Sequence, residues 1–387
     1  MNLGTSKSSK YNGVILGIVG LVIVYIITSK KIVIQFPISQ WQNKAGDRVK
    51  SCNYGVGKWV PENITRPFYS GSKCRRWLSP AMNCNMMPKR KDFSYQWFRW
   101  QPDNCHVPDF DHRSFLKRMK NKTIAFVGDS LGRQQFQSLM CMATDGGRLS
   151  TKDVGTEYNF VKSKDALVKG SCAYRIRISN TTIVFHGTRT LCEMKPSSDD
   201  YMAVHIDRID PFISQFLHKI HVLVLNTKHH WTPWTMKRDK WVVHVNGSPV
   251  KDKKLTTASN ARNFAVSSAI HWLDSQLSRH PGLNVFFRSF SPNQFSNGDW
   301  NTGTCNNLNP LLHGDRTFSG NSSYDTPAIN AITQLPASGV KLLDVTGLSI
   351  LRDEAHVSKF GIHRYDCLHW CLPGIPDEWN NLLFAQI

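Results

Sequence analysis

A serine and an Asp–His pair in distant parts of the chain are the residues best suited to chemistry. Ser130 ends the run Phe126-Val-Gly-Asp-Ser, and Asp366 and His369 lie three residues apart near the C-terminus. At this spacing both side chains can lie on one side of a turn, where the carboxylate orients an imidazole that takes the serine proton. If the fold brings the two segments together, the pattern predicts a serine nucleophile that accepts an acyl group.

Each segment alone also has an ordinary structural explanation. Asp129 or Ser130 can cap a helix, because their side-chain oxygens satisfy the free N–H groups of its first turn. The Asp–His pair can belong to a surface turn held by Cys367 and Cys371. A metal site of these cysteines with His369 is a third alternative, which the tight spacing disfavours, and we expect no bound metal.

The elements around Ser130 predict an α/β domain. Thr123–Val127 is an apolar run typical of a buried strand, and Leu131–Met142 follows it as an amphipathic helix. Apolar strands separated by helices indicate a parallel sheet with helices on both faces. Ligands of such a sheet bind beyond the carboxyl ends of its strands, so Ser130 would stand at the rim of a crevice. Further strands are expected at 174–178, 182–185, 222–225, 285–287 and 340–344, the first two as a hairpin, and a helix at 261–279.

The charge of the chain narrows its partners. The 387 residues carry a formal net charge of +20, and 41% of them are hydrophobic, enough to bury a core and to exclude a disordered chain. Such an excess suits nucleic acid, an anionic membrane or an acidic substrate. The first 31 residues hold four lysines and no acidic residue, so the remainder keeps +16. The excess therefore belongs to the part that would meet a substrate.

An uncharged run near the N-terminus predicts a membrane anchor. Tyr11–Ser29 has nineteen residues without a charge, which as a helix would span about 28 Å, close to the hydrocarbon thickness of a bilayer. A cleaved signal peptide is the alternative, but β-branched residues occupy the positions where small residues should precede a cleavage site. We expect a cytosolic tail at 1–10, a transmembrane signal-anchor at 11–29 and a stem at 30–50.

Cysteines and glycosylation motifs predict a lumenal body. All ten cysteines and five Asn-x-Ser/Thr sequons follow the uncharged run. Disulfides and N-glycans belong to oxidising compartments, so the expectation is a single-pass type II membrane protein with a lumenal body and no nucleic-acid partner. The sequons begin at Asn63, Asn121, Asn180, Asn246 and Asn321.

The lumenal body is expected to have two parts. Residues 51–121 hold four cysteines, little helical periodicity and an aromatic cluster at 93–100, which predict a smaller N-terminal lobe stapled by disulfides. Residues 122–387 carry the strand and helix pattern of the catalytic domain.

Several aromatic residues allow two interpretations. Trp97, Trp100, Trp231 and Trp234 can stack on sugar rings or pack between the lobe and the sheet. We favour packing for Trp97 and Trp100, and both alternatives stay open for Trp231. The neighbouring His229 and His230 follow the strand at 222–225, and for each we favour hydrogen bonding to a nearby loop over contact with substrate.

Seven segments together resemble one family: Cys52–Val60, Tyr95–Cys105, Phe126–Gln135, Asn226–Trp231, Arg288–Pro292, Asp299–Gly303 and Asp366–Gly374. They are similar to the trichome birefringence-like proteins, plant polysaccharide O-acetyltransferases of the Golgi, and most similar to the subgroup of members 14 to 16. The resemblance runs from Ser51 to Ile387. Gly-Asp-Ser after the first strand and Asp-x-x-His near the C-terminus also match the chain order of SGNH/GDSL esterases, which implies serine acyl chemistry on a flavodoxin-like sheet.

The resemblance implies Ser130 as the nucleophile, His369 as the general base and Asp366 as the residue that orients it. Four further positions are implied, more loosely, at the oxyanion or substrate site: Arg133, Asn226, Gly128 and Trp231.

The chain departs from the family pattern at two positions near these residues. Gln134 stands where many members have Asn, and Lys228 stands where a close relative would have Gly. The departures leave the three catalytic positions unchanged and bear on the oxyanion site and the choice of acceptor.

The function implied is transfer of an acetyl group to hydroxyls of a cell-wall polysaccharide in the Golgi, with xylan favoured over xyloglucan and pectin. The donor would be acetyl-CoA or an acetylated intermediate passed by a partner protein, and no tightly bound cofactor is expected. The same residues would serve a polysaccharide acetylesterase if water reached the acyl-enzyme. A non-catalytic protein that binds pectin or another glycan through basic and aromatic residues is a third alternative.

Overall fold

A computed structural model describes residues 52–103, 105–161, 170–295, 303–305, 325–335, 339–360 and 365–387. The predicted tail, anchor and stem, and the sequon at Asn321, lie outside these residues. Within them, no helix combines the length and apolar character needed to cross a membrane. Cys52–Ile387 forms one compact unit by its internal contacts.

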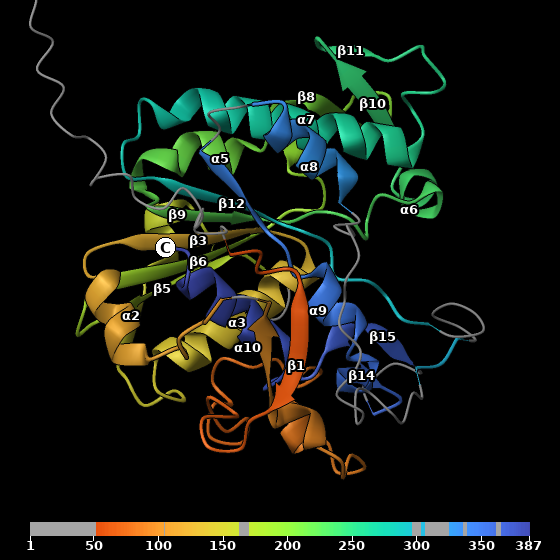
Figure 1. Ribbon diagram of the computed structural model, residues 1–387. Helices are drawn as coiled ribbons and strands as arrows, with labels where there is room; N and C mark the ends of the chain where they lie inside the picture. Colours follow the sequence, from red (N-terminus) through yellow and green to blue (C-terminus); the bar gives the residue numbers. More distant parts are fainter. Residues whose placement is uncertain are drawn as a thin grey trace, which may run out of the picture. The chain divides into compact units, whose positions relative to one another are not determined.

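A seven-stranded mixed sheet runs through the centre of this unit (Figure 1). From β13 through β12, β9 and β3 to β6 the strands are parallel, whereas β5 and β4 continue the sheet antiparallel. The parallel sheet predicted for the domain is correct for the strands from β13 to β6. The hairpin predicted at 174–178 and 182–185 is confirmed as the antiparallel pair β5 and β6, because the short turn between them leaves no room for a crossover helix. The strands are β3 Thr123–Gly128, β4 Thr151–Asp153, β5 Cys172–Ile176, β6 Thr181–Gly187, β9 Val222–Leu225, β12 Asn284–Arg288 and β13 Val340–Leu343.

Helices cover both faces of the sheet, as predicted. Side chains alternate along β3: Ile124 and Phe126 join the core under α3 and α10, while Ala125 and Val127 join the core under α5, α7 and α8. The helices are α2 His112–Arg118, α3 Ser130–Ala143, α5 Pro211–Phe216, α6 Pro233–Arg238, α7 Ala258–Leu277, α8 Thr326–Thr333, α9 Thr346–Ile350 and α10 Ile375–Phe384. Short 3-10 turns lie at Cys84–Met86, Ser94–Gln96, Gly155–Tyr158, Leu217–Lys219 and Asp353–Ala355.

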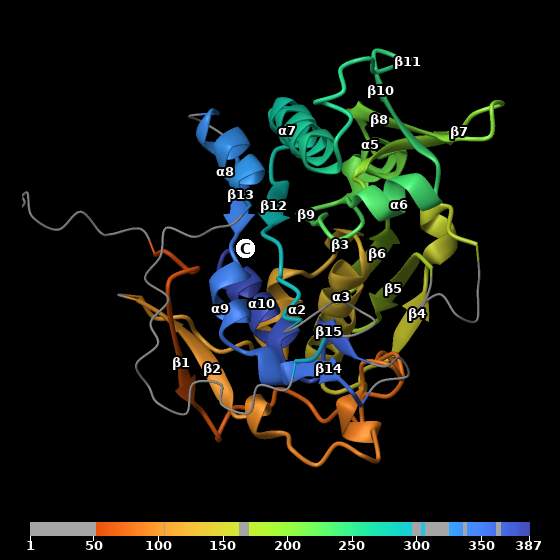
Figure 2. The same ribbon diagram turned by 90° about the vertical axis from the view of Figure 1, so that its right-hand side faces the viewer.

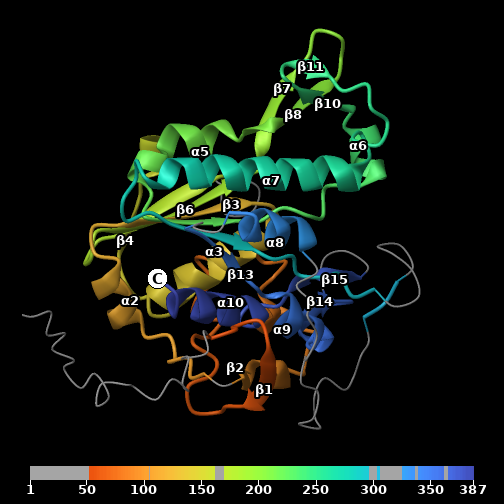
Figure 3. The same ribbon diagram turned by 45° about the horizontal axis from the view of Figure 1, so that its top comes forward.

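A second, four-stranded sheet was not predicted. It has the order β11-β10-β8-β7 and lies beyond α7 (Figure 3), where Val204 and Val243 pack with alanines of that helix. Its strands are β7 Cys192–Pro196, β8 Met202–Ile209, β10 Trp241–Val245 and β11 Ser248–Pro249. Two antiparallel pairs complete the described strands, β1 Gly57–Pro61 with β2 Phe98–Pro102 and β14 His356–Ser358 with β15 Asp366–Trp370.

Disulfides attach the N-terminal lobe to the catalytic domain. Cys52–Cys105 closes the lobe on itself, but Cys74 bonds to Cys141 at the end of α3 and Cys84 bonds to Cys371 just after β15. A fourth bond joins Cys305 to Cys367. The predicted disulfide bonding of the lobe is therefore confirmed, and two of these disulfides attach it to α3 and to the end of β15, which carry the candidate catalytic residues. Cys172 and Cys192 are buried thiols outside any disulfide.

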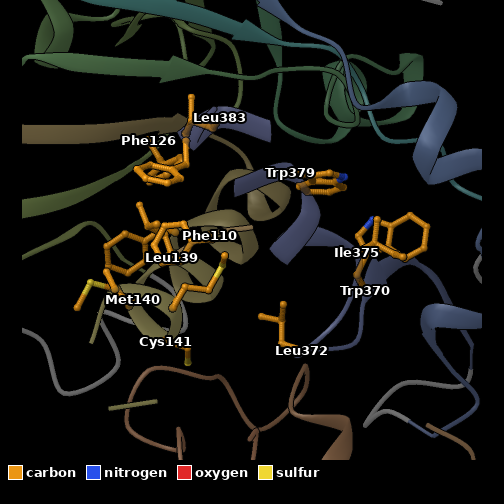
Figure 4. Packing of buried hydrophobic residues seen from close by; sticks show 14 of the residues in the cluster. Phe110, Phe126, Leu139, Met140, Cys141, Trp370, Leu372, Ile375, Trp379 and Leu383 are labelled. Atoms are coloured by element: carbon orange, nitrogen blue, oxygen red, sulfur yellow. The ribbon is translucent and has the colours of Figure 1, made fainter. Parts of the chain in front are cut away.

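One apolar core joins α3, α10 and the end of β15 (Figure 4). Trp370 and Trp379 are fully buried in it, with their rings edge to face at 6.4 Å between centroids. Leu139 and Leu383 pack into the same core from the two helices. Burial of one such side chain stabilises the fold by about 2 kcal/mol, so this core fixes the helix of Ser130 against the strand of His369.

A buried carboxyl group connects the lobe, α3 and α10. The Asp377 carboxyl accepts hydrogen bonds from the Tyr69 hydroxyl at 2.9 Å, the Ser138 hydroxyl at 2.6 Å and the Gly374 amide at 2.9 Å. Burial raises the pKa of Asp377 to about 7, although the Ser138 and Gly374 hydrogen bonds oppose the shift. The group therefore titrates close to neutrality.

Asp377 should make stability depend on pH. Its folded pKa lies above the unfolded value of roughly 3.9, so its stabilising contribution is complete below about pH 4 and is lost as the pH rises to about 7. We expect the difference in unfolding free energy between wild type and Asp377→Asn to fall by on the order of 3 kcal/mol over this range. Urea unfolding of both proteins at several pH values measures it.

The comparison with Asp377→Asn is needed because buried histidines act in the opposite direction. Burial lowers the pKa of His229 to about 4 and that of His356 to about 3, so their contributions are lost as the pH falls. Both histidines are present in both proteins and cancel in the difference. A difference that stays constant between pH 4 and 7 would contradict the assignment to Asp377.

Candidate active site

Ser130 is the first residue of α3, directly after β3. Asp129 caps the helix, because its Oδ1 accepts the Leu131 N–H at 3.0 Å. The capping explanation is therefore correct for Asp129, which leaves the Ser130 hydroxyl for another partner. The position also places that hydroxyl at the positively polarised end of the helix, where negative charge is stabilised.

The second half of the site is formed by β15. The Asp366 Oδ1 accepts the backbone N–H of Leu368 at 3.2 Å and of His369 at 2.9 Å, which turns the carboxylate towards the imidazole. His369 Nδ1 lies 2.9 Å from Asp366 Oδ2, and His369 Nε2 lies 2.7 Å from Ser130 Oγ. The structure thus brings the three predicted residues into one hydrogen-bonded chain.

The protonation of this chain follows from its chemistry. Burial alone would raise the pKa of Asp366, but its hydrogen bonds to His369 outweigh burial and hold the pKa below its usual range. An ionised carboxylate only accepts, so His369 Nδ1 carries the proton and Nε2 is free to accept the Ser130 proton. This is the arrangement that activates a serine nucleophile.

The metal alternative for this segment is excluded by the disulfides. Cys367 bonds to Cys305 and Cys371 bonds to Cys84, so neither sulfur is a thiolate that can join His369 in a metal site. No group of three or more metal-ligating side chains occurs among the residues for which side chains are described.

Gln134 joins α3 to β15. Its Nε2 donates to the Trp370 carbonyl at 2.6 Å, and its Oε1 accepts the Trp370 N–H at 3.1 Å. Trp370 follows His369, and Gln134 lies one turn after Ser130, so the amide fixes the spacing of nucleophile and base. Sequence reasoning noticed Gln134 only as a departure from the family and missed this role.

His356 supports β15 from the other side. Its ring stacks on the Trp370 indole at 3.8 Å between centroids, and its Nδ1 lies 3.2 Å from the His369 carbonyl. The Trp370 indole N–H donates to Ser291 Oγ at 2.9 Å. The backbone of His369 is therefore held from both sides.

Asn226 lies directly after β9 and holds the nucleophile turn. Its Nδ2 donates to Asp129 Oδ1 at 2.6 Å. A Cβ on Gly128 would lie 2.2 Å from Asn226 Oδ1, and one on Gly132 would lie 2.3 Å from it, so both positions need glycine for this close approach. An amide has two N–H bonds, and the oxyanion role predicted for Asn226 would use the second.

Asp129 stays ionised under the nucleophile. Burial would raise its pKa, but the charge of Arg288 and the Asn226 hydrogen bond keep the pKa below its usual range. Arg288 is 1% exposed and packs over the Trp379 ring at 4.6 Å. A buried positive charge thus stabilises the carboxylate that caps α3.

The remaining predicted positions lie around this turn. The Arg133 guanidinium lies 5.2 Å from the Phe185 ring, near the end of β6, and burial lowers its pKa. Trp231 is 7% exposed, donates to Thr227 Oγ1 at 3.0 Å and packs edge to face on Trp241, which favours packing over a sugar contact. His229 donates to the Ser291 carbonyl at 2.9 Å, the loop contact that we favoured.

A second Ser–His–Asp chain is centred on β6, with Ser171 just before β5 and Asp210 at the cap of α5. Ser171 Oγ is 3.2 Å from His186 Nδ1, and His186 Nε2 is 3.2 Å from Asp210 Oδ1. Ser171 Oγ also accepts the Gly187 N–H at 3.1 Å, and Gly187 is the register partner of Gly128. With its oxygen bound to this amide, Ser171 holds the end of β6, which pairs with the end of β3. Sequence spacing gives no sign of this chain.

The fold and the hydrogen-bonded Ser–His–Asp chain are those expected of an SGNH/GDSL-type protein. Residues 107–386 match a family described as a GDSL/SGNH-like acyl-esterase family found in Pmr5 and Cas1p, and residues 50–106 match the PMR5 N-terminal domain. By class, the protein is therefore an acyl-esterase or acyltransferase.

Curated relatives identify the family within this class. Trichome birefringence-like 14 of Arabidopsis thaliana is 45% identical over 90% of this chain and 89% of its own length. Trichome birefringence-like 15 is 44% identical over 88% of this chain and 71% of its own length. Xylan O-acetyltransferase 7 of Oryza sativa subsp. japonica is 30% identical over 88% of this chain and 60% of its own length. The chain belongs to the trichome birefringence-like family, which confirms the resemblance.

Replacing Gln134 should separate the nucleophile from the base. In Gln134→Met two buried backbone groups of Trp370 lose their partners, which should lower the unfolding free energy by about 2–4 kcal/mol. Displacement of His369 relative to Ser130 should slow reaction of Ser130 with p-nitrophenyl acetate at least about tenfold. Urea unfolding and the rate of acetyl incorporation, measured by protein mass, check both effects.

Gln135 offers a matched control on the same helix. It is fully buried, and neither atom of its amide has a hydrogen-bond partner in the part of the chain that the structure describes. Gln135→Met should therefore leave stability almost unchanged. If Gln134→Met and Gln135→Met lose equal unfolding free energy and acetylation rate, the cause is poor accommodation of methionine in this helix, and the contact with Trp370 is unimportant.

Proposed function

We propose that this protein is an O-acetyltransferase that moves an acetyl group to hydroxyls of a plant cell-wall polysaccharide through an acyl-enzyme on Ser130. The observation that carries the proposal is the chain Ser130–His369–Asp366, with Ser130 at the start of a helix and His369 Nε2 at 2.7 Å from its Oγ. Xylan is the favoured acceptor, supported by the relative named as a xylan O-acetyltransferase.

In the first half of the reaction Ser130 takes the acetyl group. His369 Nε2 accepts the hydroxyl proton as the Ser130 oxygen attacks the carbonyl carbon of the donor, and Asp366 stabilises the resulting imidazolium. The start of α3, with Asn226 and Arg133 nearby, would stabilise the oxyanion. His369 then gives the proton to the leaving group of the donor.

In the second half the acceptor hydroxyl replaces the donor. His369 takes the hydroxyl proton, the sugar oxygen attacks the acetyl carbon, and the bond to Ser130 Oγ breaks as His369 returns the proton. The chemistry needs neither a metal nor a tightly bound cofactor. The donor would be acetyl-CoA or an acetylated intermediate delivered by a partner protein.

We also propose a Golgi membrane location with the catalytic body in the lumen and residues 11–29 as the anchor. The four disulfides of the described part support an oxidising compartment. Four sequon asparagines are exposed, but Asn180 Nδ2 donates to Asn121 Oδ1 at 3.1 Å, so two glycans would compete for one place.

An acetylesterase is the second candidate, favoured by the family model, whose description is that of an acyl-esterase. It would use the same acyl-enzyme and differ only in the second half, where water attacks. The ratio of free acetate to acetylated oligosaccharide separates the two functions.

The decisive experiment supplies purified protein with an acetyl donor and deacetylated oligomers of xylan, xyloglucan or pectin. We expect acetylated xylan oligomers by mass spectrometry and at least about a thousandfold loss of product with Ser130→Ala, because the nucleophile is removed. Product formed equally by Ser130→Ala, or none with any acceptor, would refute transfer. Free acetate as the sole product would support the esterase.

A further inference from the structure

One exposed tryptophan lies on the helix that follows the loop of Asn226. Trp234 is 66% exposed, on the short helix α6 that follows the loop after β9. The guanidinium of Arg238 lies 4.2 Å from its ring and covers one face. The other face of the ring is open to solvent, and tryptophan is a residue type enriched at binding interfaces.

The position of α6 connects Trp234 to the nucleophile turn. The loop between β9 and α6 carries Asn226, which binds Asp129, and His230, whose pKa responds to charges on both sides. Those charges are Asp129 on the nucleophile turn and, towards α6, Arg189, Arg238 and Asp239. Figure 2 shows α6, the start of α3 and β15 on the same side of the molecule.

The surface between Ser130 and Trp234 has the properties of a site for a sugar chain. Arg189 and Arg238 share the carboxylate of Asp239, so one positive charge is left over. Burial lowers the pKa of His230, which favours the neutral imidazole, a partner for hydroxyl groups. An aromatic face, a neutral hydrogen-bonding group and a cation match a pyranose ring with an acidic substituent nearby.

We propose that Trp234, His230 and Arg238 form an acceptor subsite for a polysaccharide that carries carboxylate groups. The apolar face of one sugar unit stacks on the open side of the Trp234 ring, and Arg238 attracts the carboxylate. The subsite extends the proposed function, because it would hold the chain whose hydroxyl attacks the acetyl group on Ser130. The subsite would also explain part of the net charge of +16 carried by the residues after the first 31.

Binding without turnover tests the subsite separately from the acetyl transfer. The probes are a xylo-oligosaccharide bearing one glucuronic acid and the neutral xylo-oligosaccharide of the same length, titrated calorimetrically into the full chain carrying Ser130→Ala. Adding Trp234→Ala should raise Kd for both probes about five- to tenfold, the scale of one aromatic contact. Adding Arg238→Gln should raise Kd only for the acidic probe, and added salt should reduce this difference.

Trp97 supplies the matched control. It is 43% exposed and lies just before β2, in the N-terminal lobe. Trp97→Ala should leave both Kd values unchanged. Equal weakening by Trp97→Ala and Trp234→Ala, or no effect of Trp234→Ala on either probe, would overturn the subsite.

Two further outcomes keep the subsite distinct from its alternatives. If Trp234→Ala weakens binding of coenzyme A and leaves both oligosaccharides unaffected, the surface is a donor site and the proposal is wrong. Acetylation of wild-type Ser130 by p-nitrophenyl acetate tests the acyl-enzyme independently. Oligosaccharide binding that depends on Trp234 without acetylation of Ser130 would support the subsite and refute the proposed transfer.

Discussion

The contact between α3 and β15 is the constraint on which the site depends. Ser130 and His369 are 239 residues apart, yet their side chains must meet within a hydrogen bond. Gln134 meets this requirement because its two hydrogen bonds to Trp370 join α3, one turn after Ser130, to β15, one residue after His369. The surrounding core is rigid because tightly packed side chains resist small shifts. The hydrogen bonds between the Gln134 side chain and the Trp370 backbone lie within this core, so helix α3 and strand β15 have little freedom to move relative to each other.

The N-terminal lobe can be understood as the outer support of this contact. Cys84 forms a disulfide with Cys371, two residues after His369. Arg90 donates to the backbone carbonyls of Glu354 and His356 at 2.7 Å each. Tyr69 reaches the carboxyl group at the start of α10, which packs against α3. The lobe contributes no member of the Ser–His–Asp chain. It holds the strand of the base and the helix that follows, which explains why the two matched family segments occur in one compact unit.

Local patterns were enough to predict β3 and the start of α3, because strand and cap preferences act over a few residues. The Asp–His segment was expected as a turn and instead forms the strand β15, paired with β14. Contacts between segments distant in sequence could not be predicted from local patterns. The disulfide partners of Cys84 and Cys74, the bonds of Gln134 and the chain Ser171–His186–Asp210 all join segments whose proximity only the fold decides. The second sheet was missed although its signal is present: in β8 polar His205 and Asp207 alternate with the apolar residues, a pattern typical of a half-buried strand.

The balance between transfer and hydrolysis is set outside the Ser–His–Asp chain. His369 is 16% exposed and Ser130 is half-buried, so solvent reaches the site in the free protein. In the proposed mechanism, hydrogen bonds within the chain would activate any hydroxyl near His369 and would not distinguish water from sugar. An acceptor must therefore displace water by binding, and its affinity comes from the surface beside the triad. In this protein that surface carries Lys228 and His230 in the loop after β9, so the choice of acceptor is expected to vary with this loop while the catalytic chain stays the same.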